Sequence, residues 1–378
     1  MKKNLLIISK NVFTNYDYER FKIEKLKKNF DISYLDCSSL FYNKKIQKKI
    51  SDKNYHTAKN LFDFFKTIKD NKPDLIFDLL GFSFSYKTSF LRLFANFSAL
   101  CIFFSIGPRQ RISSIGNINQ FFKIIFFSPV KFLIILNNFL TKKMFIKFIF
   151  YNSIILIGSK YREQMIRNIK SNKIIFYHSN DYDNYLRGVN KKIPFLKKKY
   201  GVFIDENVPD HSDYQIVNYK SPIQARKYYD LMNNFFENYE KKFNLSIVIA
   251  IHPKSNISQM RKNFLNRRII KNNTMGLIHN AKIVFTHCST ARSYAVLYKK
   301  PIICLTSNII SKTWFGDEIL VNSKLTGSKL INLDNYKLKK LSSVKINLNR
   351  YKEYEVNFLK HPNSKRILFE DIIKQIGN

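Results

Sequence analysis

An acidic turn in the second half of the chain holds the side chains best suited to nucleophilic or acid–base chemistry. Residues 205–213 read DENVPDHSD, with four carboxylates and one histidine, in a chain that has 27 acidic and 65 basic residues. The apolar run 202–204 directly before this turn predicts a buried strand. Such a strand would deliver Asp205 to the carboxyl end of a sheet, where open α/β sheets bind their ligands. A solvated turn is the alternative, but the position favours a reactive carboxylate.

A second loop, His252-Pro253-Lys254, follows the apolar run 246–251 and suits a phosphate or a nucleotide. Proline disfavours helical backbone at the residue before it, so His252 is expected to be extended. Lys254 adds a positive charge. The alternative is an ordinary strand end with a solvent-facing lysine. The loop therefore supports a binding site only in combination with the acidic turn and the third loop.

A third loop runs from a predicted strand, residues 282–286, into a predicted helix, residues 290–298. Ser289 or Thr290 would make a good N-cap, and the N–H groups of the first helical turn would favour an anion, with Arg292 close by. Ordinary capping without a ligand is the alternative. One acidic loop and two anion-binding loops at strand ends together predict a nucleotide-sugar site.

Several other chemistries lack their sequence signatures. The chain has neither GxGxxG nor GxxxxGK[ST], which argues against dinucleotide oxidoreductases and P-loop hydrolases. It has no HExxH and no GxSxG. We expect no cofactor and no metal, because Lys254 and Arg292 could neutralise the leaving phosphate of a nucleotide-sugar donor.

Short apolar runs alternate with helix-length segments along the whole chain, which predicts parallel sheets covered on both faces. The fold class is therefore α/β, with two Rossmann-like doubly wound domains facing each other across a cleft. We expect a first domain over residues 1–185, a second over 186–350 and C-terminal helices over 351–378 that cross back. The predicted strands are residues 5–8, 32–35, 74–78, 99–104, 154–157, 173–177, 202–204, 246–251, 282–286 and 301–305, and the clearest predicted helices are 18–28, 223–241, 290–298 and 351–376.

An apolar and basic insertion near residues 118–150 interrupts this alternation. Within residues 121–150, five lysines break the apolar run, so it does not reach the about 20 residues that a transmembrane helix needs. Two interpretations stay open: a hairpin lying on an anionic membrane, or helices packed inside the first domain.

The formal charge of +38 invites a nucleic-acid interpretation, but the basic residues are spread from Lys2 to Lys374 instead of gathering on one element. The abundance of Lys, Asn, Ile, Phe and Tyr also fits a genome poor in G and C. We expect no nucleic-acid partner and favour an anionic membrane surface. The four cysteines form no CxxC pair, and the apolar run after Met1 is short, so we expect a cytoplasmic protein, peripheral on the inner face of the cell membrane.

Three motifs resemble a known family. His252-Pro253, Ser289-Thr290 before a helix, and Lys300-Pro301-Ile302-Ile303 resemble the donor domain of two-domain (GT-B) glycosyltransferases, including the HP and S/T motifs of bacterial sialyltransferases and Kdo transferases. The runs 181–186 and 201–206, followed by Pro209 and His211, resemble the retaining β-Kdo transferases and their relatives in O-antigen and capsule assembly. Ser212 stands where that pattern has proline.

The resemblance implies a glycosyltransferase that moves a sugar from a nucleotide-activated donor, such as CMP-Kdo or a similar ulosonate, to a lipid-linked surface-polysaccharide acceptor. Asp205 would be the nucleophile, because retention requires two inversions at one carbon. Glu206, Asp210 or His211 would manage protons, and His252 with Ser289 and Thr290 would hold the nucleotide. Two alternatives stay open: a glycerol-phosphate-type transferase of the same fold, and a non-catalytic basic protein that binds an anionic polymer or membrane.

Overall fold

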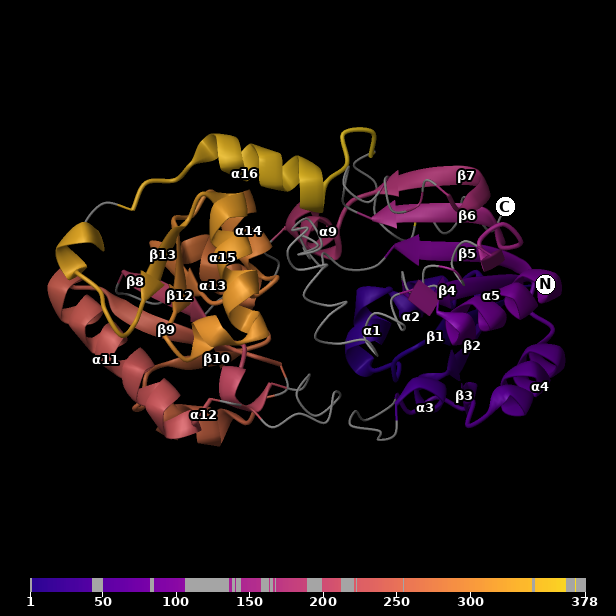
Figure 1. Cartoon of the computed structure of the whole chain (residues 1–378), viewed down its shortest axis with the longest axis horizontal. Helices are drawn as coiled ribbons and strands as arrows, with labels where there is room; N and C mark the ends of the chain where they lie inside the picture. The colour runs from indigo at the N-terminus through magenta and orange to yellow at the C-terminus, as the bar shows by residue number, and fades with distance from the viewer. Residues whose placement is uncertain are drawn as a thin grey trace. The chain divides into compact units, whose positions relative to one another are not determined.

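The computed structural model describes residues 2–42, 50–81, 85–105, 144–157, 168–188, 199–211, 223–253, 255–341 and 344–364, and in addition 136–137, 140, 163, 166, 221 and 371. The chain divides into two compact units (Figure 1). The first unit comprises Met1–Gly107, Ser113–Asn180 and Lys360–Asn378, and the second comprises Pro108–Ile112 and Asp181–Leu359.

A seven-stranded sheet forms the first unit, in the order β3-β2-β1-β4-β5-β6-β7, and its paired strands are all parallel. Its strands are β1 (Lys3–Ser9), β2 (Phe30–Asp36), β3 (Tyr55–Thr57), β4 (Leu75–Leu79), β5 (Leu100–Ser105), β6 (Phe150–Ile157) and β7 (Lys170–Tyr177). Its helices include α1 (Asn15–Arg20), α2 (Ile23–Leu26), α3 (Ser38–Phe41), α4 (Leu61–Asn71) and α5 (Tyr86–Ser98).

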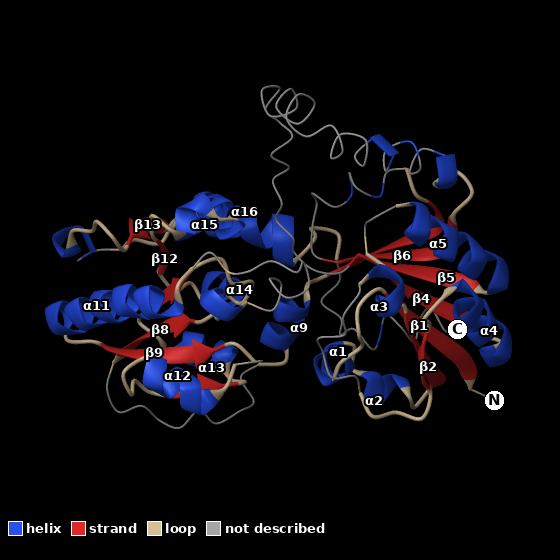
Figure 2. Ribbon diagram, turned by 60° about the horizontal axis from the view of Figure 1, so that its bottom comes forward, coloured by secondary structure: helices blue, strands red, loops and turns tan. Residues whose placement is uncertain are grey.

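Alternating side chains of these strands build two separate cores. Leu6 and Ile8 of β1 pack with α4 and α5, whereas Leu5 and Ile7 pack with the segment that contains α1 and α2. Helices therefore cover both faces of the sheet (Figure 2). Burial on both faces explains why the parallel strands read as short continuous apolar runs in the sequence.

The second unit has a six-stranded parallel sheet in the order β10-β9-β8-β11-β12-β13. The first strand, β8, lies in the middle, and the direction of winding reverses between β8 and β11. Such a reversal is the place where doubly wound sheets bind ligands, outside the carboxyl ends of the strands. The strands are β8 (Tyr200–Ile204), β9 (Ser246–Ile251), β10 (Ile269–Lys271), β11 (Ile283–Thr286), β12 (Ile302–Thr306) and β13 (Lys329–Asn332).

Helices surround this second sheet and share one continuous core with it. The helices are α9 (Asn180–Leu186), α11 (Ala225–Phe243), α12 (Ile257–Asn263), α13 (Thr274–Asn280), α14 (Arg292–Leu297), α15 (Trp314–Thr326) and α16 (Leu348–Tyr354), with short turns η2 (Val208–Asp210), η3 (Ile310–Lys312) and η4 (Leu338–Leu341) and a π-helix η5 (Glu355–Leu359).

The predicted α/β class with two Rossmann-like sheets is confirmed, and two helix predictions are wrong. The expected helix 18–28 is two short helices, because Lys22 between them is left-handed, with φ 51°. The expected helix 351–376 ends its helical run at Leu359, shortly before His361-Pro362, where proline disfavours helical backbone at the preceding residue.

Much of the apolar insertion lies outside the described residues: 106–135, 138–139 and 141–143. Residues 189–198, within the expected polar connection, lie outside them as well. Among the helices that the structure describes, none combines the length and the apolar character needed to cross a membrane.

Candidate functional site

The acidic loop meets the two other loops at the carboxyl edge of the second sheet. β8 pairs in parallel with both β9 and β11, so the three strands end side by side. The Asp205 N–H donates to the Ala250 carbonyl of β9 at 2.9 Å, and the Cys288 N–H beyond β11 donates to Glu206 Oε2 at 2.9 Å. The sequence-based grouping of these loops therefore corresponds to a real neighbourhood within one unit.

Asp205 is a buried carboxyl group, and one of its two oxygens accepts no hydrogen bond from a described residue. Its side chain is 2% exposed, and Oδ1 accepts from the Asn207 N–H at 3.1 Å. Oδ2 is buried and has no hydrogen-bond partner among the described residues. Burial raises the pKa of Asp205 to about 6. The nearby N–H groups of Asn207, His252 and Glu206 lower this pKa, but burial has the larger effect. The carboxyl is thus poised to exchange a proton or accept a ligand near neutral pH.

Glu206 is engaged on both of its oxygens. Oε2 accepts from the Cys288 N–H, and Oε1 accepts from the Cys288 thiol at 3.4 Å. Burial raises the pKa of Glu206 to about 7, although the Cys288 groups and the Arg292 charge lower it. Since neither oxygen is left without a partner, Glu206 ties the loop after β8 to the loop after β11.

Two histidines, His211 and His252, lie close to each other in the loops after β8 and β9. The His211 ring lies 6.3 Å from the His252 ring and 5.3 Å from the Phe315 ring, measured between centroids. His211 and His252 are half-buried and Pro253 is exposed, whereas Lys254 lies outside the described residues. Of the three side chains that the sequence offered for a proton-handling role, Glu206 is bonded, Asp210 is exposed and His211 faces His252.

The helix after β11 is capped differently from the prediction. Its N-cap is Ala291, so the expectation that Ser289 or Thr290 caps it is wrong. The turn before the helix already uses most of its amides: the Ser289 N–H donates to Thr286 Oγ1, and the Ala291 N–H donates to Ser289 Oγ. Exposed Thr290 makes no hydrogen bond through its hydroxyl with a described residue, so this side chain is the group that the loop offers to a ligand.

Arg292 lies beneath this loop. It is buried, and its Nη1 donates to the carbonyls of Cys288 and Ser289 at 2.7 Å each. Its guanidinium also lies over the Tyr354 ring, 5.6 Å from the centroid. In this structure Arg292 holds the loop through these two carbonyls, and its predicted role in neutralising the leaving phosphate stays a prediction.

His287 is a site-supporting residue that sequence reasoning missed. Because a carbonyl can only accept, His287 Nδ1 carries the proton that bonds the Leu305 oxygen at 2.7 Å, and Nε2 accepts from the Tyr228 hydroxyl at 2.8 Å. Burial lowers the pKa of His287 to about 4, so the ring is neutral at pH 7. The position of His287 at the end of a strand was the only signal, because Tyr228 lies 59 residues away.

Buried polar atoms without partners gather at this same edge. Besides Asp205 Oδ2, these are Asn207 Oδ1, Ser255 Oγ and Thr306 Oγ1, which follow or end β8, β9 and β12. Native proteins satisfy most buried polar atoms, and each exception calls for an explanation such as a missing ligand. Four such atoms at neighbouring strand ends make this edge a candidate binding site, although other buried atoms without partners, such as Tyr34 OH and Ser89 Oγ, lie in the first unit.

Asp181 and Asp183 lie outside the loops that follow β8, β9 and β11, on a helix of their own. The one Asp-x-Asp triplet, Asp181-Tyr182-Asp183, lies on α9, and Asp183 is buried in an ion pair with Arg187 at 2.6 Å. Within the described part of the chain, no group of three or more His, Cys, Asp or Glu side chains is placed to hold a metal ion.

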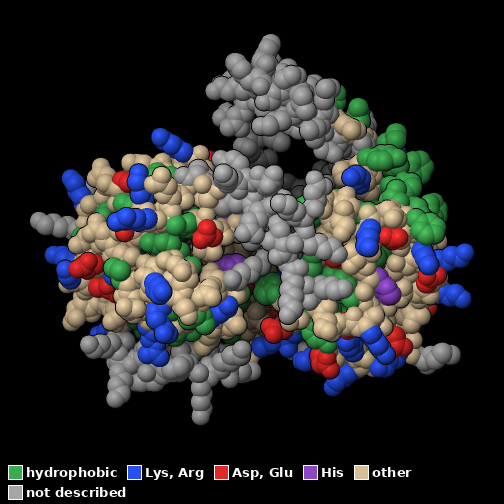
Figure 3. All heavy atoms as spheres, turned by 90° about the horizontal axis from the view of Figure 1, so that it is seen from below, with side chains coloured by type: hydrophobic (Ala, Val, Ile, Leu, Met, Phe, Trp, Pro, Cys, Tyr) green, Lys and Arg blue, Asp and Glu red, His purple; other side chains and the backbone are tan. Residues whose placement is uncertain are grey.

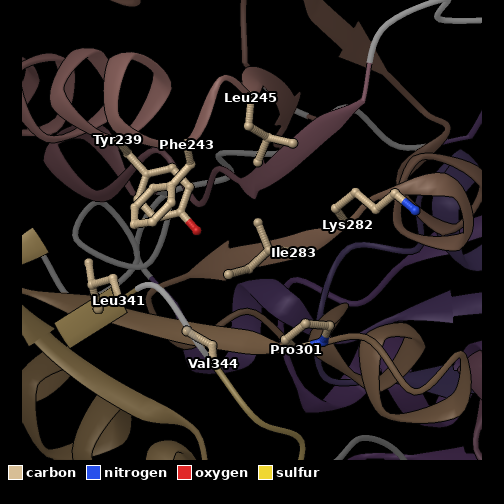
Figure 4. A pocket seen from close by; sticks show the side chains of 8 residues that line it. All are labelled: Tyr239, Phe243, Leu245, Lys282, Ile283, Pro301, Leu341 and Val344. Carbon is tan, nitrogen blue, oxygen red and sulfur yellow. The ribbon is translucent and has the colours of Figure 1, made fainter. Parts of the chain in front are cut away.

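A separate pocket of about 180 Å³ lies at the opposite edge of this sheet (Figure 4). Leu245 precedes β9, Lys282 precedes β11 and Pro301 precedes β12, so the pocket is at the amino ends of the strands. Its lining residues are Tyr239, Phe243, Leu245, Lys282, Ile283, Pro301, Leu341 and Val344. None of the candidate site residues contributes to it.

Comparison with solved structures establishes the fold. The chain resembles MnaA of S. aureus, solved with UDP, at 14% identity over 100% of this chain and 96% of that chain, with a TM-score of 0.53. It resembles the UDP-GlcNAc 2-epimerase of Methanocaldococcus jannaschii at 15% identity and the glycosyltransferase SnogD of Streptomyces nogalater at 8%, each over 100% of this chain and 99% of that chain, with TM-scores of 0.50. No protein-family model matches the sequence, and no curated protein is similar enough to match.

These neighbours have the GT-B fold of two Rossmann-like domains, so the predicted fold class is confirmed. They include epimerases as well as glycosyltransferases. The more specific resemblance to the retaining β-Kdo transferases stays a hypothesis.

Proposed function

We propose that the chain is a glycosyltransferase that binds a nucleotide-activated sugar at the carboxyl edge of its second sheet. The observation that carries the proposal is the set of unpartnered buried atoms there, above all Asp205 Oδ2, Ser255 Oγ and Thr306 Oγ1. The ribose, the phosphate and the sugar of such a donor supply hydrogen-bonding groups for both hydroxyls and carboxylates. Two neighbours of the same fold are described with UDP or as acting on UDP-GlcNAc, which agrees with a nucleotide ligand.

The arrangement suggests a role for each group. Asp205, with a pKa of about 6, is mostly ionised at pH 7 and is the candidate nucleophile. Its carboxylate would bond to the anomeric carbon as the nucleotide leaves with the bonding electron pair. The acceptor hydroxyl would then attack the same carbon, release the carboxylate and give its proton to a base. We assign this role to His211, whose ring lies near that of His252.

The remaining candidates serve the nucleotide. His252 and Thr290 stand at the ends of β9 and β11, on either side of the loop that carries Asp205. Imidazole and hydroxyl groups can donate hydrogen bonds to phosphate oxygens. Lys254, Pro253 and Ser289 belong to the same two loops and are included in the proposal, whereas Glu206 and Arg292 hold the loops in place.

The finer part of the proposal concerns the substrates. The resemblance of residues 201–206, Pro209 and His211 to retaining β-Kdo transferases favours CMP-Kdo or a similar ulosonate donor. The same resemblance favours a lipid-linked glycan acceptor at the inner face of the cell membrane. The formal charge of +38 suits an anionic acceptor and an anionic membrane surface.

The test is to measure which nucleotide the purified chain binds and releases. CMP, CDP and UDP are titrated while thermal unfolding is followed, because a ligand of the native state alone raises the melting temperature. CMP-Kdo, UDP-GlcNAc and CDP-glycerol are then offered with a lipid-linked glycan acceptor, and the released nucleotide and the modified acceptor are identified.

Release of nucleotide with transfer of sugar to the acceptor would support the proposal. Transfer of glycerol phosphate would assign the alternative phosphotransferase, and conversion of the sugar without transfer would assign an epimerase. Stabilisation by none of the nucleotides would overturn the proposed site. The matched variants are Asp205→Asn and, as a control, Asp230→Asn at an exposed position on α11.

A further inference from the structure

The first unit has an exposed apolar surface at the amino ends of its strands. Phe97 is 86% exposed, Phe148 68%, Leu100 56% and Phe150 46%. We call these four residues the aromatic edge. Figure 3 shows hydrophobic side chains gathered at the right-hand side of the view, on the unit that holds β1 to β7. Apolar side chains that cluster on the surface of a protein mark an interaction site.

The four residues come from chain segments that meet where β5 and β6 begin. Phe97 lies at the end of α5 and Leu100 begins β5, while Phe150 begins the neighbouring strand β6. The Phe150 N–H donates to Asn96 Oδ1 at 2.7 Å, which fixes the start of β6 beside the end of α5. Ile149 and Tyr151 are fully buried, so the backbone around Phe148 and Phe150 is anchored in the core while these two rings face outward.

Lysines lie beside this edge, together with one exposed carboxylate, Asp74, which directly precedes β4 next to β5. Residues 79–162 contain eleven Lys or Arg and no Asp or Glu. Lys147 directly precedes Phe148, and Lys170 of β7 is the register partner of Phe150. Lys147 and Lys170 are both exposed, and neither makes an ion pair with any residue in the described ranges.

We propose that the aromatic edge docks on the surface of an anionic lipid bilayer. Aromatic rings enter the boundary between headgroups and acyl chains, while lysines around them pair with lipid phosphates. A symmetric contact with a second copy would bring like charges together, because the same patch would serve both subunits. The inference assigns the membrane contact of the proposed function to one particular surface, yet it rests on the first unit alone and does not depend on donor chemistry.

The test is flotation of the full chain with vesicles of phosphatidylcholine alone and of phosphatidylcholine mixed with phosphatidylglycerol. We expect binding to the anionic vesicles that weakens with added salt. The variant Phe97→Ser/Phe148→Ser should lower the partition coefficient by about tenfold or more, since two apolar rings no longer insert. The variant Lys147→Glu/Lys170→Glu should lower it by at least about tenfold on the anionic vesicles only.

The matched control is Leu265→Ser, which changes an apolar side chain of similar exposure, 65%, in the second unit. This variant should bind vesicles like the unchanged chain, and thermal unfolding verifies that every variant is folded. The proposal is overturned if the chain does not float with either kind of vesicle, or if the aromatic and control variants bind equally well. Light scattering without lipid measures whether the chain forms a dimer. If it does, and if the variant Phe97→Ser/Phe148→Ser is a monomer, the aromatic edge is a self-association surface and the proposal is overturned. Flotation needs no sugar donor, so its failure would leave the donor site untouched.

Discussion

The buried carboxyl of Asp205 should make the ligand-free second unit less stable as the pH rises. Its pKa is raised from 3.8 to about 6 because burial disfavours the charged form. Between these two values the folded chain holds a proton that the unfolded chain has released, so the free energy of unfolding falls with rising pH. A shift of two pKa units corresponds to about 3 kcal/mol, fully expressed above about pH 7.

His287 acts in the opposite direction. Its pKa is lowered from 6.5 to about 4, so the unfolded chain binds the additional proton between these values and stability rises with pH. The unchanged chain therefore shows a partly compensated profile. Glu206, whose pKa is raised from 4.5 to about 7, acts in the same direction as Asp205. The difference between this chain and the variant Asp205→Asn reports chiefly on Asp205, because His287 contributes equally to both and the charge of Asp205 has only the smallest effect on the pKa of Glu206.

The assay is urea unfolding across the range from about pH 4 to about pH 7, followed by tryptophan fluorescence. The single tryptophan, Trp314, lies on α15 and reports on the second unit. Relative to the unchanged chain, the Asn variant should gain up to about 3 kcal/mol as the pH rises through this window. Asp230→Asn, at an exposed site, should give a constant offset. Parallel profiles for the unchanged chain and the Asp205 variant would refute the view that this carboxyl is buried without a full set of partners.

Three further predictions test the site and its support. Asp205→Ala should abolish sugar transfer while nucleotides still raise the melting temperature, and full activity of this variant would remove the nucleophile assignment. Glu206→Ala should lower the free energy of unfolding of the second unit by about 1 to 3 kcal/mol, because the buried Cys288 N–H loses its acceptor. Glu206→Gln keeps an accepting oxygen and should cost less. Urea unfolding followed by tryptophan fluorescence measures both losses, and equal losses would contradict the role of this hydrogen bond. Asp78→Ala should lower the free energy of unfolding of the first unit by about 3 to 5 kcal/mol. The reason is that Arg92, which is buried and bonded to Asp78 at 2.7 Å, would lose its counter-charge. Unfolding followed by far-UV circular dichroism measures this loss, and a loss below about 1 kcal/mol would contradict the prediction.

The sequence predicted the parts of the fold that are buried on both faces. Strands such as β1, β8 and β9 read as apolar runs because their apolar side chains are buried on both faces of the sheet. The short strands β3, β10 and β13 were missed because they lie at the sheet edges, are only partly buried and lack such runs. The break between α1 and α2 was missed because it depends on the backbone angle of one lysine.

For the candidate site, the sequence predicted which loops would meet but not how their side chains would be used. Strand ends gave the positions of Asp205 and His252, since parallel neighbours end at one edge. The inward direction of Arg292 and the pairing of Glu206 with Cys288, 82 residues away, depend on packing between distant segments. Sequence patterns over a few residues contain no information about such distances.

The central claim, that the carboxyl edge of the second sheet is the nucleotide site, is tested most directly by a crystal structure with the nucleotide that stabilises the chain best. We expect density for the nucleotide at the ends of β8, β9 and β11, in hydrogen-bond contact with His252 or Thr290 and beside Asp205. A nucleotide seated instead at the amino ends of the strands, in the pocket lined by Tyr239 and Lys282, would contradict it.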